Sequence, residues 1–164
     1  MLSSWIIILR KFIFLSLAAS LVGTSPTYAF GDYPLASCKF NNGTIIEKTG
    51  VNTDKAMIKG IVTRADIQEY CERDPGGVTR KTGGKLTLKQ CVEQEYRSQK
   101  ELDLKTTASC PLKTLSYRVN GTLIRSIKFP LPLDADTSCA SGMPPLIAQF
   151  IILCPDAAKR LEME

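Results

Sequence analysis

Histidine is absent from the 164-residue chain, and its absence excludes several classes of function. Histidine is the commonest general base and the commonest zinc ligand in proteins. Hydrolase triads that depend on it and most catalytic zinc sites are therefore excluded. Aromatic residues are also scarce, at 7% of the chain, which leaves too few clusters of basic and aromatic residues for a nucleic-acid surface.

Long apolar runs are few, and the first of them lies near the N-terminus. Arg10 and Lys11 precede an apolar run over residues 12–22, which is followed by a small-residue site that ends at Ala29. This order is typical of a secretory signal peptide, and the run is shorter than the roughly 20 apolar residues that span a bilayer. We therefore expect a signal peptide over residues 1–29, export to the periplasm or the extracellular space, and no stable membrane insertion after cleavage.

A second processing signal lies close by. Residues 35–38 read Leu-Ala-Ser-Cys, the pattern that a bacterial lipoprotein signal peptidase recognises, and lipid on Cys38 would anchor the chain to a membrane. Such a pattern normally adjoins the apolar run, whereas residues 23–34 intervene here. Lipidation would also leave an odd number of cysteines. A lipoprotein anchored through Cys38 is thus the minor alternative to a freely exported domain.

All six cysteines follow the expected cleavage site. An even number of cysteines in an exported chain of this size predicts up to three disulfides. No two cysteines have the Cys-x-x-Cys spacing, and there is no histidine to complete a mixed site, so we expect no metal and no cofactor. The predicted disulfide-forming residues are Cys38, Cys71, Cys91, Cys110, Cys139 and Cys154.

Two Asn-Gly pairs, at residues 42–43 and 120–121, lie between β-prone residues. This is the strongest short signal for a β-hairpin, so we expect one two-stranded ribbon around each pair. In the second ribbon the apolar pattern changes parity after Ile124. The change predicts either a bulge near Arg125 and Ser126 or a ribbon with both faces partly covered.

Capping boxes between the two ribbons predict two helices. Thr63, with an acid three residues later, opens a helix over about residues 63–74. Thr87, with a glutamine three residues later, opens a longer helix over about residues 87–105, which carries an apolar stripe at three- and four-residue spacing. The chain therefore contains a helical hairpin in its middle section.

The connection between these helices, residues 76–85, contains four glycines and three basic residues. It lacks the spacing of a phosphate-binding loop, and its composition predicts an exposed, mobile loop. Arg80, Lys81 and Lys85 are candidate contacts for an anionic partner, such as lipid headgroups or an acidic cell-wall polymer.

The helical hairpin predicts one disulfide directly. Cys71 lies near the end of the first helix and Cys91 one turn into the second, so an antiparallel hairpin brings them together. The other four cysteines allow three arrangements. We favour the arrangement in which Cys38 pairs with Cys154, because both adjoin predicted strands, and Cys110 then pairs with Cys139.

The last apolar run, residues 144–155, is bounded by prolines and rich in β-branched residues, which predicts a buried central strand. Residues 156–164 read as a charged tail that forms a frayed helix. The sequence thus predicts a single disulfide-stabilised α+β domain over residues 30–155. We expect a small antiparallel β-sheet with the disulfide-linked two-helix hairpin packed on one face.

Two segments carry a resemblance: residues 65–71, Ala-Asp-Ile-Gln-Glu-Tyr-Cys, and residues 88–96, Leu-Lys-Gln-Cys-Val-Glu-Gln-Glu-Tyr. They are similar to a pattern in small, uncharacterised exported bacterial proteins with a cysteine-linked helical hairpin, and more faintly to LprI-like lysozyme-inhibitor segments. The glycine-rich spacer is longer than in the first pattern, and Asp103 replaces the asparagine of the second. The resemblance covers about residues 65–104, implies an exported bacterial helical hairpin, and transfers no functional residue.

Two functions fit these residues. The favoured one is an exported, non-catalytic, disulfide-linked interaction module, such as a periplasmic partner or inhibitor of an envelope enzyme, because the distinctive residues serve disulfides and turns. The alternative is a carboxylate-dependent enzyme that acts on cell-wall or surface polymers. It would need a pair of carboxylates across the helical hairpin, formed by Glu69 or Glu72 of the first helix with Glu93 or Glu95 of the second. The partner is an unidentified protein or other envelope component, and a cleft with two convergent acids would favour the enzyme.

Overall fold

The computed structural model describes residues 31–35, 42–73, 86–138 and 141–161. The expected signal peptide, the basic loop with Arg80, Lys81 and Lys85, and the cysteines Cys38 and Cys139 lie outside these residues. The described part has an α+β fold, as predicted, with one six-stranded antiparallel sheet and four helices. None of these four helices is long and apolar enough to cross a membrane.

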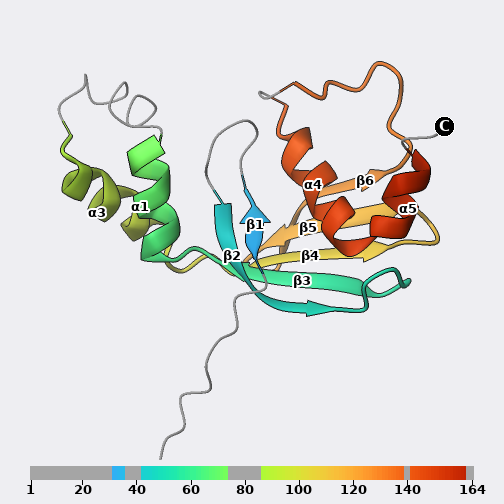
Figure 1. Ribbon diagram of the computed structural model, residues 1–164, viewed down its shortest axis with the longest axis horizontal. Coiled ribbons are helices and arrows are strands. Elements are labelled where there is room, and N and C mark those ends of the chain that lie inside the picture. The colour runs from blue at the N-terminus through green and yellow to red at the C-terminus, as the bar shows by residue number, and fades with distance from the viewer. Residues whose placement is uncertain (1–30, 36–41, 74–85, 139–140, 162–164) are drawn as a thin grey trace, which may run out of the picture.

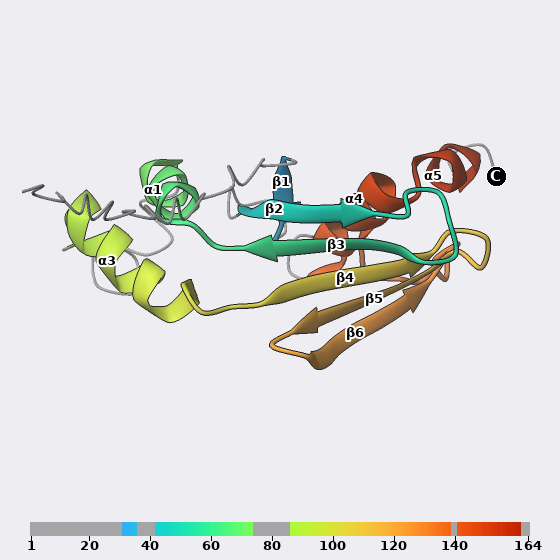
Figure 2. The same cartoon turned by 90° about the horizontal axis from the view of Figure 1, so that it is seen from below.

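The sheet is a meander in which each strand pairs with the next strand along the chain. All neighbouring strands are antiparallel. The connection between β3 and β4 contains the two helices of the predicted hairpin (Figures 1 and 2). They lie beyond one end of the sheet and not on one of its faces as predicted, because α4 (Met143–Leu153) packs on that face instead. The strands are β1 (Asp32–Pro34), β2 (Asn42–Thr49), β3 (Ala56–Ile61), β4 (Leu104–Ser109), β5 (Thr114–Val119) and β6 (Thr122–Lys128).

The apolar run at residues 144–155 is a helix, α4 (Met143–Leu153), and not the predicted strand. Pro144 and Pro145 occupy its first turn, where a helix tolerates a missing N–H and where the fixed φ of proline favours helix. Leu146, Phe150 and Leu153 recur at helical spacing and are buried. Their side of α4 packs against the sheet, so this helix forms the second layer of the fold (Figure 1).

The chain continues from α4 into a short helix, α5 (Pro155–Leu161), within the segment predicted to be a charged tail. Ala157 and Ala158 of α5 are buried. Two hydrogen bonds join the turn between β2 and β3 to the start of α5. Asn52 Nδ2 donates to Asp156 Oδ2 at 2.7 Å, and the Asp156 amide donates to Asn52 Oδ1 at 3.1 Å. The described part of this segment therefore packs on the domain.

The two predicted helices are α1 (Arg64–Arg73) and α3 (Leu88–Gln99). Both capping boxes form: the Asp66 amide donates to Thr63 Oγ1 at 3.2 Å and the Thr63 amide to Asp66 Oδ2 at 2.7 Å, and Thr87 makes the equivalent pair with Gln90. α3 ends at Gln99, whereas the sequence predicts a helix to about residue 105. It is shorter because residues 104–105 already belong to β4 and pair with β3 and β5.

The predicted disulfide between Cys71 and Cys91 is present and joins α1 to α3, with Cα atoms 6.1 Å apart. The two other predicted pairs, Cys38 with Cys154 and Cys110 with Cys139, are wrong, because Cys110 is bonded to Cys154. Cys154 follows a helix that packs on the sheet, not a strand, and this brings its Cα within 5.3 Å of that of Cys110 at the end of β4. Disulfides of this kind fit an oxidising compartment.

The second Asn-Gly pair forms the predicted hairpin turn. Asn120 and Gly121 have φ values of 49° and 77° and connect β5 to β6. Arg118 pairs with Leu123 and Tyr117 with Arg125, so Ile124 is an extra residue in β6. The bulge predicted beside Arg125 is confirmed, and it explains the change of parity in the apolar pattern.

The first Asn-Gly pair does not form a turn. Asn42 and Gly43 lie inside β2, where they pair with Pro34 and Tyr33 of β1. The strand that pairs with them therefore lies farther upstream than a two-residue turn allows. The prediction of a tight ribbon around residues 42–43 is wrong because the three-residue β1 carries little pattern of its own.

Candidate functional site

One face of the sheet has no helix over it in the described part of the chain. Figure 1 shows α4 and α5 on one side of the strands, and Figure 2, seen from below, shows the strands in front of α4. We call this uncovered side the open face and define it by residues that alternate with the buried ones. They are Met57, Lys59, Lys105, Thr107, Ser109, Thr114, Ser116 and Arg118, all of them partly exposed.

Three cations form a row across the open face. Lys59 lies opposite Lys105, and Lys105 lies opposite Arg118, on the neighbouring strands β3, β4 and β5. Adjacent strands are about 4.8 Å apart, and like charges directly opposite each other destabilise a sheet. The row therefore opposes folding, and a negatively charged ligand would remove that cost.

Only the first cation of the row has an ion-pair partner among the described residues. Lys59 Nζ lies 2.8 Å from Glu47 Oε2 on β2, and this hydrogen bond raises the pKa of Lys59 above its usual value. Lys105 and Arg118 form no ion pair within the described ranges. Two positive charges on adjacent strands are thus available to an anion.

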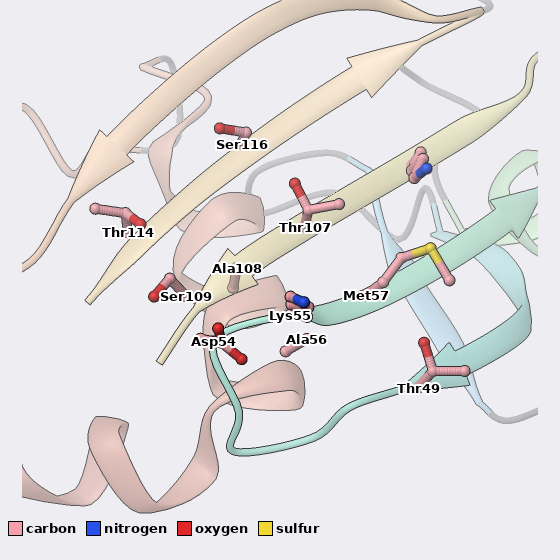
Figure 3. Close-up of a pocket in the computed structure, with 11 residues that line it drawn as sticks. Thr49, Asp54, Lys55, Ala56, Met57, Thr107, Ala108, Ser109, Thr114 and Ser116 are labelled. Atoms are coloured by element: carbon pink, nitrogen blue, oxygen red, sulfur yellow. The ribbon is translucent and has the colours of Figure 1, made fainter. Parts of the chain in front are cut away.

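Hydroxyl groups lie beside the cation row. Thr107 pairs with Ser116 two residues farther along β4 and β5, and Ser109 pairs with Thr114 two residues beyond. Together with Met57 they line a shallow depression of about 460 Å³. Figure 3 shows Thr107 and Ser116 projecting from neighbouring strands on the side away from the helices. The depression therefore presents donors and acceptors next to positive charge.

One of these hydroxyls is both buried and without a hydrogen-bond partner in the described part of the chain. Ser109 Oγ is buried and unpaired, and a buried hydroxyl without a partner costs free energy. Ser116 Oγ lies 3.2 Å from Ser126 Oγ on β6, so the row of hydroxyls extends to the edge strand. Because Ser109 Oγ is buried, a ligand in the depression would contact it only after a local rearrangement.

The covered face contains polar groups of a different kind. Tyr33 OH lies 2.6 Å from Thr106 Oγ1, Thr106 donates to Gln149 Oε1 at 2.8 Å, and Gln149 Nε2 donates to the Pro34 carbonyl at 2.7 Å. Burial raises the pKa of Tyr33 above its usual value. A Cβ atom at Gly60 would overlap the Tyr33 ring, so this position requires glycine. This series of hydrogen bonds joins β1, β4 and α4, and each of its side chains has a partner.

The four helix carboxylates do not converge. Glu93 accepts two hydrogen bonds from Arg64, at 2.7 and 3.3 Å, and this contact lowers the pKa of Glu93 below its usual value. The other three bind separate side chains: Glu69 binds Arg73, Glu72 binds Gln68, and Glu95 binds Gln99. In the described segments, no group of three or more His, Cys, Asp or Glu side chains is arranged to hold a metal ion.

A second hollow, of about 250 Å³, is apolar and lies between the segment after β6 and the helices α4 and α5. The rings of Phe129 and Phe150 lie at its base, with centroids 4.3 Å apart. None of the described residues that line it is charged, so these residues offer an incoming group apolar contact. The residues around it are Phe129, Pro130, Leu131, Ile147, Phe150, Ile151, Ala158 and Leu161.

The open face was not predicted from the sequence. Residues 104–109 read Leu-Lys-Thr-Thr-Ala-Ser, and their burial alternates with a period of two. The first two of these residues were assigned to the predicted second helix. The alternation of buried and exposed residues was therefore not recognised as a strand. The candidate cations from the sequence, Arg80, Lys81 and Lys85, lie outside the described residues, and the cations on the open face are different ones.

Comparisons with known proteins place the chain in no family. No protein-family model matches it, and no curated protein or solved structure gives a significant match. What the protein does must therefore be inferred from its own residues, above all those of the open face.

Proposed function

We propose that this protein is an exported, non-catalytic interaction module, held together by disulfides, that binds an acidic partner of the cell envelope through the open face. The observation that carries the proposal is the row of Lys59, Lys105 and Arg118 on an uncovered sheet face. Two of these cations have no acidic partner in the described part of the molecule. Repulsion between these cations destabilises the fold, and a ligand that binds them explains why the row is present.

Export is supported by two independent features. The order of basic, apolar and small residues before Ala29 is that of a signal peptide. The disulfides Cys71–Cys91 and Cys110–Cys154 suit the oxidising conditions outside the cytoplasm. These features also favour a partner in the cell envelope.

A carboxylate-dependent enzyme has less support. Glycoside cleavage by carboxylates needs two acids on either side of the scissile bond. The side chains around the depression include one carboxylate, Asp54. The helix carboxylates Glu69, Glu72, Glu93 and Glu95 each bind a different side chain, as described above.

The direct test is retention of the mature protein on carboxylated, phosphorylated and neutral beads. We expect retention on both kinds of anionic bead, with an affinity that falls as salt rises. The double variant K105A/R118A should lose most of this retention.

The matched control is K159A/R160A, which removes one lysine and one arginine from α5 on the covered side of the sheet. Both control residues are exposed, so the two double variants change the net charge equally. Equal losses in both variants would show that net charge, and not the open face, causes retention. No retention of the native protein on any anionic bead would overturn the proposed function.

A further inference from the structure

We infer that the acidic partner is an anionic glycan of the uronic-acid type, and that its chain runs across the strands of the open face. This inference rests on the proposed function and specifies its ligand. It comes from two adjacent rows of side chains on the open face, one of cations and one of hydroxyl groups. A surface that binds anions by charge alone would not need the hydroxyl row.

The two rows are parallel and close together. Lys59, Lys105 and Arg118 form the first row, and Thr107 with Ser116 forms the second, two residues farther along the strands. Two residues of a strand span about 6–7 Å. A sugar acid carries a carboxylate at one edge of its ring and hydroxyl groups at the others. A chain of such units that crosses the strands can therefore contact both rows along its length.

The hydroxyl row distinguishes a glycan from a denser polyanion. A serine or threonine hydroxyl both donates and accepts, as sugar hydroxyls do, whereas phosphate oxygens in a polyphosphate accept only. Two cations of the neighbouring row, Lys105 and Arg118, have no ion-pair partner among the described residues, and this number suits one charge per sugar better than closely spaced phosphates.

The open face also differs from a typical protein-binding surface. Protein interfaces are centred on aromatic or other large apolar side chains that fill pockets in the partner. Among the eight residues that define the open face, none is aromatic and one, Met57, is apolar; the exposed Leu123 of β6 lies opposite Arg118 on the same side. An acidic polypeptide would therefore find charge on this face but no aromatic anchor among the residues that define it.

The experiment is a titration of the mature protein with three soluble probes: oligogalacturonate, inorganic polyphosphate and poly-glutamate. We expect oligogalacturonate to bind most tightly. The variant K105A/R118A should weaken its binding by about tenfold or more, since hydrogen bonds to charged groups are lost, and K159A/R160A should leave it unchanged.

A second pair of variants tests the hydroxyl row. T107V/S116A removes two hydroxyls from the open face and should weaken oligogalacturonate binding by about tenfold. It should weaken polyphosphate binding less, because phosphate oxygens use the hydroxyls only as donors, whereas sugar hydroxyls use them as donors and acceptors. The matched control T122V/S98A removes two exposed hydroxyls outside the open face and should change neither.

The outcomes separate this inference from the proposed function. If polyphosphate or poly-glutamate binds as tightly as oligogalacturonate, or if T107V/S116A does not weaken oligogalacturonate binding, the inference of a glycan ligand is wrong. The proposed function, anion binding by the open face, would then still stand. If none of the three probes binds, both the glycan and the proposed function are overturned.

Discussion

The two faces of the sheet are built from the same strands, yet they treat polar side chains in opposite ways. On the covered face, Thr106 lies in a buried chain of hydrogen bonds between Tyr33 and Gln149. On the open face, the next residue, Thr107, lines a solvent-accessible depression beside Lys105. These polar groups of the covered face bond to one another, whereas Lys105 and Arg118 of the open face form no ion pair with any described residue.

This difference shows how one strand can serve two purposes. Because successive side chains of a strand point to opposite faces, β4 supplies the core and the candidate site in alternate positions. The covered face makes the fold stable, and the open face gives up stability through its opposed cations. Substitutions on the covered face should therefore lower stability, whereas substitutions on the open face should weaken binding at little cost in stability.

The largest effect is expected where the covered face is tied to its helix. The Cys110–Cys154 disulfide joins the end of β4 to the end of α4 and closes a loop of 44 residues, whereas Cys71–Cys91 closes one of 20. C110S/C154S should lower the free energy of unfolding by about 4 kcal/mol and C71S/C91S by about 3 kcal/mol, because longer loops lose more entropy on closure. Urea unfolding of both double variants measures the difference.

Non-reducing peptide mapping provides the control for these variants. It should recover one peptide with Cys71 linked to Cys91 and another with Cys110 linked to Cys154. A peptide that joins Cys110 to Cys38 or to Cys139 would contradict the packing of α4 on the sheet.

The neighbouring threonines give the next largest effect and the sharpest contrast between the faces. T106V removes the hydroxyl that Tyr33 and Gln149 share, so it should lower the free energy of unfolding by about 1–3 kcal/mol. T107V should change it by less than about 0.5 kcal/mol, because no described group depends on that hydroxyl for a hydrogen bond. Equal effects in urea unfolding would mean that the two faces do not differ as described.

Alkaline pH should act on the covered face through Tyr33. Burial raises the pKa of Tyr33, so the folded protein keeps the phenol proton at a pH where the unfolded chain releases it. The free energy of unfolding should therefore fall as the pH rises above about 10, the usual pKa of tyrosine.

The comparison variant for the alkaline experiment is Y33F, because lysines and other tyrosines also titrate in this range. Its unfolding free energy should depend less steeply on pH above 10 than that of the native protein. Parallel pH profiles for the two proteins would show that Tyr33 ionises freely and is not buried.

The smallest expected effect has the opposite sign and lies on the open face. K105Q removes the middle charge of the cation row, so it should raise the free energy of unfolding by about 0.3 kcal/mol. The same variant should bind anionic beads less tightly than the native protein. A loss of stability in K105Q would show that Lys105 supports the fold and would remove the main support for a ligand.

The elements with strong local signals were predicted correctly. The capping residues Thr63 and Thr87 set the starts of α1 and α3, and the pair Asn120-Gly121 forms the turn of the β5–β6 hairpin. The disulfide Cys71–Cys91 followed from these helices. In each case a few neighbouring residues determine the backbone conformation, so no knowledge of distant contacts is needed.

The elements that depend on distant contacts were not predicted. The run at residues 144–155 is apolar enough for a buried strand or a buried helix, and only its packing across four strands decides for the helix α4. Cys154 changes its partner as a result. The open face could not be predicted either, since it exists only when Lys59, Lys105 and Arg118 come together from three strands.

The most direct test of the central claim is methyl NMR of the mature protein during titration with oligogalacturonate. Met57 and Thr107 belong to the open face, whereas Ile58 and Thr106 follow or precede them in the same strands and are buried on the other side. The methyl signals of Met57 and Thr107 should shift in proportion to bound ligand, and those of Ile58 and Thr106 should stay nearly constant. Shifts confined to Leu131 and Ile151, around the apolar hollow, would contradict binding at the open face.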